Sequence, residues 1–330
     1  MEKQIKITTI GWGAWSFNVL YGLKNHPEYA LNSVIWMCDN GGTAGAIRDK
    51  YGILPPWDTR RAIAALAKNT WMVRKLFEYK FDESGVIWGN KIGNILLTAL
   101  TDITGSSEAW IDALAEMFDA QGKVIPVTLE DVHLWVRFDD GVEVIGEKNI
   151  DISDTNPWER AHNPDAKITD AFLVWGKWAL NPRAREVIMD SDYIVLWPGD
   201  LYTSIIPNLL SEGMKEALLE TPAKIIYMCN IMTKRWETSH MEVTDFVDVI
   251  EKYVWERNID YVVVNNGFIS EEVVERYKQT EGKKPVKVKD KTLLEWRVFS
   301  LIEADLVDEA DVVRHNPKKV EEVIRKIVGL

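Results

Sequence analysis

The chain has 330 residues, with 39 Lys and Arg against 51 Asp and Glu, so its net charge is −12. A hydrophobic share of 46% and a charged share of 27% are typical of a globular protein and exclude a disordered one. The acidic charge, without any basic stripe, excludes a general nucleic-acid binder. The unusual count is that of tryptophan, with 15 residues where roughly one or two in a hundred are expected.

The sequence contains no sign of export or of a membrane anchor. No apolar run approaches the roughly 18–20 residues of a membrane span, and residues 1–4 (MEKQ) do not begin a secretion signal. We therefore expect a cytoplasmic protein without a membrane span. Cys38 and Cys229 cannot make a disulfide framework, and five scattered His residues form no zinc motif, so no metal site is predicted.

The first half of the chain alternates short strands with helices. Strands are predicted at residues 5–10 and 31–37, and helices at 16–23, 59–67, 72–79, 94–102 and 108–120. Because Pro55 and Pro56 exclude a helix just before Asp58, we interpret Asp58 as the N-cap of the helix at 59–67. The stretches 132–138 and 142–145, joined by Asp-Asp-Gly, predict a β-hairpin.

The second half repeats the alternation. Strands are predicted at 193–196, 223–229 and 261–265, and an amphipathic helix at 320–328. Strands separated by helices indicate βαβ units. The expected fold is therefore α/β, a three-layer Rossmann-like and mostly parallel sheet with helices on both faces and a small β-hairpin insertion. Since no repeat or long linker is present, residues 1–330 are expected to form a single domain, with the insertion at about 130–150.

In such a sheet, ligands bind beyond the carboxyl ends of the strands, where polar and glycine-rich loops are predicted. Glycines there let backbone N–H groups approach a phosphate, Asp accepts hydrogen bonds from sugar hydroxyls, and Arg binds phosphate. A plain turn or a helix cap explains each loop equally well when it is taken alone. The candidates from the loops are Gly11, Gly13, Ala14, Asp39, Asn40, Gly41, Gly42, Asp58, Arg60, Gly199, Tyr202, Thr203 and Ser204.

Four further candidates lie later in the chain, two of them at the end of the strand at 223–229. Asn230 and Thr233 would offer amide and hydroxyl contacts, Tyr277 would stack on a base, and Arg314 would hold a phosphate. Each of them is also compatible with an ordinary surface position. No nucleophile with a nearby base is indicated by spacing, so no catalytic residue is predicted.

Several of these segments together resemble the gluconeogenesis-factor family, the YvcK-type branch of a superfamily that also contains 2-phospho-L-lactate transferase. The resemblance runs from about residue 5 to about residue 327. Its most specific parts are the ILPP block followed by Asp58 and Arg60, and the block PGDLYTSIIPNLL at 198–210. The other segments that carry it are 39–45 with Arg48, GNILL at 93–97, which adds Asn94 to the candidates, CNIMT at 229–233 and RHNP at 314–317.

The resemblance implies a cytoplasmic regulator that binds a nucleotide sugar, UDP-N-acetylglucosamine, and is linked to cell shape and wall synthesis on gluconeogenic carbon sources. It implies contacts to that ligand from the first glycine loop, the Asp39 loop, Tyr277 and Arg314. A homo-oligomer and a regulatory protein partner are expected, and no cofactor is assigned. The alternative is a Mg-dependent phosphotransferase like 2-phospho-L-lactate transferase, with Asp39 and Asp58 as candidate metal ligands. A dinucleotide-dependent oxidoreductase is disfavoured because the first loop has no clear GxGxxG.

Five tryptophans stand where the family pattern carries glycine: Trp12, Trp15, Trp57, Trp197 and Trp236. At a left-handed backbone position a side chain costs about 1–2 kcal/mol relative to glycine, and an indole also fills the space of a phosphate. Our hypothesis is that some of these residues are glycines in the organism, encoded by a reassigned UGA codon that was translated as Trp. UGG codons at these positions would exclude it. The alternative is a divergent relative with genuine tryptophans and an altered pocket.

The family pattern also carries a His in the segment before residue 93. Asn90 stands there in this chain, which puts any role of that His in doubt.

Overall fold

The computed structural model describes residues 4–11, 16–37, 57–81, 91–150, 162–163, 165–174, 178–254, 257–295, 297–308 and 313–330. Its strands are β1 Ile5–Ile10, β2 Tyr29–Ile35, β3 Lys123–Pro126, β4 His133–Phe138, β5 Glu143–Ile145, β6 Ile168–Val174, β7 Tyr193–Leu196, β8 Lys224–Met228, β9 Tyr261–Asn265, β10 Ser300–Ala304, β11 Val307–Asp308 and β12 Arg314–His315. Its helices are α1 Ser16–Leu23, α3 Trp57–Leu66, α4 Thr70–Glu78, α5 Ile92–Thr104, α6 Ser107–Met117, α7 Glu147–Ile150, α8 Pro182–Met189, the π-helical turn η2 Leu201–Ile205, α9 Ile206–Leu209, α10 Met214–Glu220, α11 Val243–Val254, α12 Glu271–Glu281, α13 Lys291–Glu295 and α14 Pro317–Val328.

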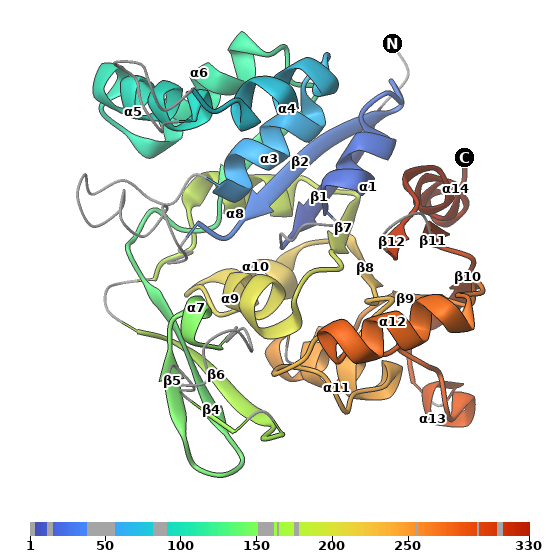
Figure 1. The fold of residues 1–330 in the computed structure, drawn as a ribbon. Helices are drawn as coiled ribbons and strands as arrows, with labels where there is room; N and C mark the ends of the chain where they lie inside the picture. The colour runs from blue at the N-terminus through green and yellow to red at the C-terminus, as the bar shows by residue number, and fades with distance from the viewer. Residues whose placement is uncertain are drawn as a thin grey trace.

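A parallel sheet forms the centre of the molecule (Figure 1). Within the described residues it has seven strands in the order β10-β9-β8-β7-β1-β2-β3, and all neighbouring pairs run parallel. Strand β1 lies inside the sheet, where Ile7 is opposite Leu31 of β2 on one side and Tyr193 of β7 on the other. The chain order therefore reverses between β1 and β7, and such a switch point is where open α/β sheets bind ligands.

Alternation along the strands builds a hydrophobic core on each face of the sheet. In β8, Ile225 and Tyr227 belong to one core, whereas Ile226 and Met228 belong to the other. The first core is completed by α8 to α11 and the antiparallel strands, and the second by α1, α3 to α6, α12 and α14. The predicted three-layer α/β fold, with a mostly parallel sheet and helices on both faces, is confirmed.

The predicted hairpin is also confirmed, because β4 and β5 pair antiparallel. Strand β6 pairs with the other side of β4 and makes a small three-stranded sheet, which extends away from the central sheet next to α7 (Figure 1). Strands β3, β6, β10, β11 and β12 were not predicted. Strands β3 and β10 are the two edges of the central sheet. In β10, partial exposure removes the continuous apolar run of a buried strand, whereas β3 is mostly buried but short and ends in Pro126, which weakens a strand prediction.

The interpretation of Asp58 as an N-cap is wrong. Helix α3 begins at Trp57, so Asp58 lies within its first turn. An acidic side chain is favourable there because it faces the positive end of the helix dipole.

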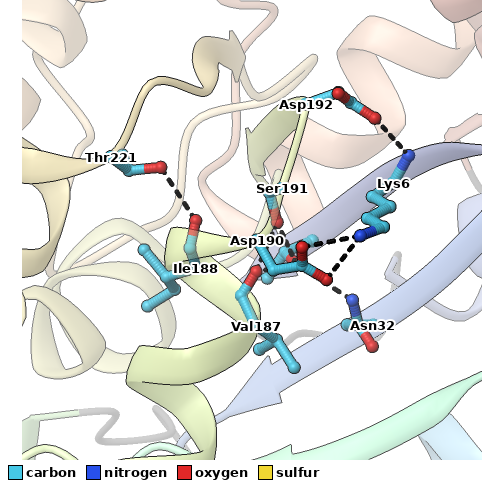
Figure 2. A network of polar contacts seen from close by, with 9 residues as sticks. Lys6, Asn32, Val187, Ile188, Asp190, Ser191, Asp192 and Thr221 are labelled. Atoms are coloured by element: carbon cyan, nitrogen blue, oxygen red, sulfur yellow. Dashed lines mark hydrogen bonds and ion pairs between the residues drawn. The ribbon is translucent and has the colours of Figure 1, made fainter.

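Polar contacts fasten the amino-terminal end of β1 to the turn between α8 and β7 (Figure 2). The backbone N–H of Lys6 donates to Asp192 over 2.9 Å, and its ammonium group donates to Asp190 over 2.6 Å. The buried hydroxyl of Ser191 donates to that of Thr8 over 2.6 Å. Since the Lys6–Asp190 pair is exposed, it contributes little, and the buried contacts fix this end of the sheet.

Close packing of α1 on the start of α14 gives a first prediction. A methyl group on Gly22 would lie 2.6 Å from the carbonyl oxygen of Pro317. Gly to Ala inside a helix ordinarily stabilises by about 1 kcal/mol, but here the clash with backbone should reverse the sign. We expect Gly22→Ala to lower the free energy of unfolding by about 1–3 kcal/mol, measured by urea denaturation. An Ala variant as stable as the unaltered chain would contradict this packing.

Candidate functional site

The ends of β1 and β7 lie against each other at the switch point. Gly11 follows β1 with φ of +101°, a left-handed conformation that favours glycine. A methyl group there would lie 3.6 Å from the carbonyl oxygen of Ser204 and 3.8 Å from Cβ of Trp197. The other loop candidates near this point, Gly13, Ala14, Asp39, Asn40, Gly41 and Gly42, lie outside the described residues.

A buried carboxylate organises the segment after β7. Glu237 accepts a hydrogen bond from the backbone N–H of Tyr202 over 2.9 Å and from the hydroxyl of Thr203 over 3.0 Å. The start of η2 is thus already bound by a carboxylate of this chain. The Tyr202 hydroxyl donates to the carbonyl of Ile168 over 3.2 Å, and burial raises its pKa. Both predicted residues therefore make contacts that hold the fold, and neither lines the cavities described below.

Lys234 ties the loops after β7 and β8 together. Its ammonium group lies 2.7 Å from Oδ2 of Asp200 and 2.9 Å from Oε1 of Glu237. The Glu237 side chain is fully buried, whereas that of Asp200 is 38% exposed. A buried carboxylate needs a cation of this kind, because an unpaired charge in the interior is strongly unfavourable.

A small cavity of about 70 Å³ lies beyond the carboxyl ends of β7 and β8, and we call it the polar cavity. Three predicted residues, Asn230, Thr233 and Tyr277, line it together. The ring of Tyr277 is buried, and its hydroxyl accepts a hydrogen bond from the N–H of Val313 over 3.0 Å. The sequence did not point to Asp200, Lys234, Lys283 and His315, which also line this cavity.

A second cavity of about 400 Å³ lies next to α1, α3, α4 and β12, and we call it the cationic cavity. Its lining includes five basic residues and one acidic residue, Glu78; the basic ones are Arg60, Arg61, Arg74, Lys91 and Arg314. Such an excess of positive charge fits a ligand with several negative charges, such as a diphosphate. The predicted residues Arg60 and Arg314, which lie far apart in the sequence, both line this cavity.

Arg60 is the buried member of the cationic cavity, with 4% of its surface exposed. Burial, together with the neighbouring charge of Arg61, lowers the pKa of Arg60 to about 10, so the guanidinium remains charged at neutral pH. Its guanidinium carbon lies 5.6 Å from the centre of the Phe77 ring. A methyl group on Gly93 would lie 2.5 Å from Nη1 of Arg60 and 3.1 Å from the backbone carbonyl oxygen of Phe77, so the glycine of the GNILL block leaves room for the Arg60 side chain.

The two cavities meet at β12. Successive side chains of a strand point to opposite sides, and accordingly Arg314 lines the cationic cavity while His315 lines the polar cavity. Sequence reasoning missed His315, although it stands beside the chosen Arg314 in the RHNP block. It also missed Asp200, although the neighbouring residues of the PGDLYTS block were chosen as candidates.

The remaining candidates do not line either cavity. The carbonyl of Gly199 accepts a hydrogen bond from Asn230, and that of Ser204 accepts one from Asn208. Asp58 is half-buried in the first turn of α3. Asn94 lies in α5, and its side chain is outside the described part of the structure.

Two of the unusual tryptophans can be examined in the structure. Trp236 has φ of +75°, a left-handed conformation that favours glycine. Trp197 follows β7 and is fully buried beside Gly11, and its indole N–H has no hydrogen-bond partner among the described residues. Side chains of Trp12, Trp15 and Trp57 lie outside the described residues. A glycine at position 236 would adopt the left-handed conformation without strain, and a glycine at position 197 would remove the buried indole N–H.

The conformation of Trp236 gives a second prediction. Removing its buried indole costs packing energy in any variant, so the informative comparison is Trp236→Gly against Trp236→Ala. Since the left-handed backbone penalises Cβ, we expect the Gly variant to be more stable than the Ala variant by about 1 kcal/mol in urea denaturation. Trp71, exposed in helix α4, is the matched control, where the Ala variant should be the more stable by about 1 kcal/mol. The same order at both positions would refute the interpretation.

The structure defines a Rossmann-like α/β protein with two cavities, one of them lined mainly by basic side chains. Residues 7–307 match the family model described as 2-phospho-L-lactate transferase CofD. The chain belongs to the CofD family, and its relatives place it in the gluconeogenesis-factor branch of that family.

Two relatives and one solved structure are similar to this chain over nearly their whole length. A Thermotoga maritima protein provisionally named as a gluconeogenesis factor is 36% identical over 98% of this chain and 99% of its own. The gluconeogenesis factor of Bacillus subtilis is 30% identical over 98% of both chains. A crystal structure of a UPF0052 family member from Bacillus halodurans has a TM-score of 0.87 at 31% identity, covering 97% of this chain and 99% of its own.

Within the described residues, no helix combines the length and apolar character needed to cross a bilayer. The same residues contain no group of three or more His, Cys, Asp or Glu side chains positioned to hold a metal ion.

Proposed function

We propose that this chain is a cytoplasmic regulator that binds a nucleotide sugar, UDP-N-acetylglucosamine, and that it acts in cell shape and wall synthesis on gluconeogenic carbon sources. The observation that carries the proposal is the pairing of a cationic cavity with a polar cavity at β12. A nucleotide sugar needs both kinds of environment, because its diphosphate is anionic and its sugars carry neutral hydroxyl groups. The names of the relatives support the link to gluconeogenesis.

Calorimetric titration with UDP-N-acetylglucosamine, NAD and GTP tests the ligand. We expect heat with the first ligand only, and we expect replacement of Arg314 with Ala to weaken binding at least tenfold by removing a phosphate contact. Arg183 is a suitable control, because it pairs with Asp112 outside both cavities. Equal affinity for all three ligands, or unchanged affinity in the Arg314 variant, would contradict the proposal.

The tryptophan hypothesis enters the same experiment through a second form of the chain. In a variant with Trp12, Trp15, Trp57 and Trp197 all changed to Gly, the ligand loops regain the glycines of the family pattern. Binding by this form but not by the form with tryptophans would support recoding. The control is Trp71→Gly. It changes an exposed tryptophan that has no glycine counterpart in the family pattern, and it should not restore ligand binding.

A Mg-dependent phosphotransferase is the second candidate, and the description of the family model favours it. A regulator should show ligand binding without turnover. Magnesium-dependent consumption of a phospholactyl nucleotide donor would instead support the transferase. Loss of that turnover in Asp58→Asn would then assign Asp58 to the reaction.

A further inference from the structure

Helix α4 presents a side to solvent that is both apolar and basic. Trp71 is 65% exposed, Met72 is 51% exposed, and Tyr79, which caps the helix, is 55% exposed. The exposed Lys75 follows Trp71 by four residues and Met72 by three, and it precedes Tyr79 by four. Because residues three and four apart are neighbours on a helix, these four side chains lie on one side of α4. We call them the α4 face.

The segment around the α4 face is basic within an acidic chain. Residues 57–81 contain six Lys or Arg and two Asp or Glu, whereas the whole chain has a net charge of −12. Two ion pairs lie here, Lys68 with Asp119 over 3.0 Å and Arg74 with Glu78 over 3.7 Å, and all four side chains are exposed. Exposed pairs are weak, so the basic members can exchange their partners for other anions.

Helix α1 extends this surface with a further aromatic side chain. Tyr21 is exposed, and its ring stacks on that of Phe17 with a centroid distance of 6.1 Å. The guanidinium carbon of Arg74 lies 4.9 Å from the centre of the Phe17 ring. Lys24 lies 5.1 Å from the centre of the Tyr21 ring and donates to the hydroxyl of Thr70. Aromatic and basic side chains therefore alternate from α1 to the start of α4.

An anionic bilayer surface has the chemistry that complements such a region. Trp and Tyr rings are favoured at the boundary between head groups and acyl chains, and Lys is attracted to anionic head groups. Two copies of this chain that met through their α4 faces would repel each other, because both faces are basic. A folded protein partner is also disfavoured, since Lys is depleted in protein–protein interfaces.

We propose that the α4 face, together with Tyr21, is a peripheral surface that docks the protein on bilayers containing anionic lipid. Such a surface lies on the bilayer without spanning it, and its small apolar area makes the binding reversible. The charge distribution sets the orientation, because an anionic bilayer attracts this basic region and repels the acidic remainder of the chain. The inference does not depend on the proposed nucleotide-sugar ligand.

Co-sedimentation of the full chain with vesicles tests the docking. The probes are vesicles of phosphatidylcholine alone and vesicles of an equimolar mixture of phosphatidylcholine and phosphatidylglycerol. We expect binding to the anionic vesicles to be at least about tenfold stronger, and to weaken as the salt concentration rises. Equal binding to both kinds of vesicle, or binding to neither, would overturn the proposal.

Two substitutions on the α4 face test its location separately. Trp71→Ala removes an inserted ring and Lys75→Glu reverses a charge, and each should weaken binding to anionic vesicles by about tenfold. The matched controls are Phe268→Ala, which removes a ring that is 79% exposed, and Lys278→Glu, which reverses an exposed charge in α12. Both controls should leave vesicle binding unchanged. Equal losses at the control positions, or no loss on the α4 face, would refute the assignment.

A short single-stranded RNA is the second probe, because aromatic and basic side chains also bind nucleic acid. We expect the RNA to bind more weakly than the anionic vesicles, since Met72 and Trp71 gain from an apolar phase that RNA does not offer. RNA binding that is stronger than vesicle binding, and that is lost in both Trp71→Ala and Lys75→Glu, would overturn the lipid assignment.

Discussion

Replacing Glu237 with Ala should lower the free energy of unfolding by about 3–5 kcal/mol. The carboxylate is fully buried, and it accepts hydrogen bonds from the backbone of Tyr202 and the hydroxyl of Thr203 while pairing with Lys234. The Ala variant removes the acceptor of those two hydrogen bonds and an anion that pairs with a largely buried lysine. Urea denaturation monitored by fluorescence measures the change.

Asp200→Ala is the matched control for that prediction. It removes the other carboxylate bound to the same Lys234, but the Asp200 side chain is 38% exposed and water can replace much of the contact. We expect a loss of no more than about 1 kcal/mol. Equal losses in the two variants would show that burial does not decide the strength of these pairs, and the account of Glu237 as the organising carboxylate would fail.

His315 should lower the free energy of unfolding by roughly 3 kcal/mol between pH 6.5 and pH 4. The pKa of His315 is lowered from 6.5 to about 4 in the folded protein by burial. Below pH 6.5 the unfolded chain therefore takes up a proton that the folded chain does not accept until about pH 4. Stability contributed by the neutral ring is complete above pH 6.5 and is lost between pH 6.5 and 4, at about 1.4 kcal/mol for each pH unit.

The measurement compares unfolding free energies of the unaltered chain and His315→Phe from pH 7 to pH 4. Other groups titrate in this range, but they contribute to both proteins and cancel in the difference. The His315→Phe variant should therefore gain on the unaltered chain as the pH falls. Parallel curves would show that His315 is not the buried neutral ring described above.

The central strands could be predicted because burial on both faces leaves a clear pattern. Residues 5–10 and 193–196 are short apolar runs followed by turn residues, and both were placed correctly. The edge strand β10 reads SLIEA, and only part of it is buried, so its sequence gives no comparable signal. Pairing order was not predictable either, since it depends on contacts between residues as distant as Ile7 and Tyr193.

The site was predictable to the extent that its residues follow strands. Asn230 and Thr233 were found in this way, whereas Tyr277 and Arg314 were chosen because an aromatic ring can stack on a base and a guanidinium can bind phosphate. Tyr202 and Thr203 looked like ligand contacts because they follow a strand and carry hydroxyl groups. The Tyr202 hydroxyl instead donates to the carbonyl of Ile168, and the Thr203 hydroxyl donates to Glu237. His315 was missed because its effect on stability in acid depends on burial, which the sequence does not reveal.

The central position of β1 has a consequence for synthesis of the chain. One of its two neighbours in the sheet, β7, ends at Leu196, so the N-terminal strand cannot be enclosed on both sides until nearly 200 residues have been made. At about 5–20 residues per second, this interval is roughly 10–40 s. During that time one hydrogen-bonding edge of β1 is exposed. We therefore expect the nascent chain to depend on chaperones, and a truncated chain ending before β7 to aggregate.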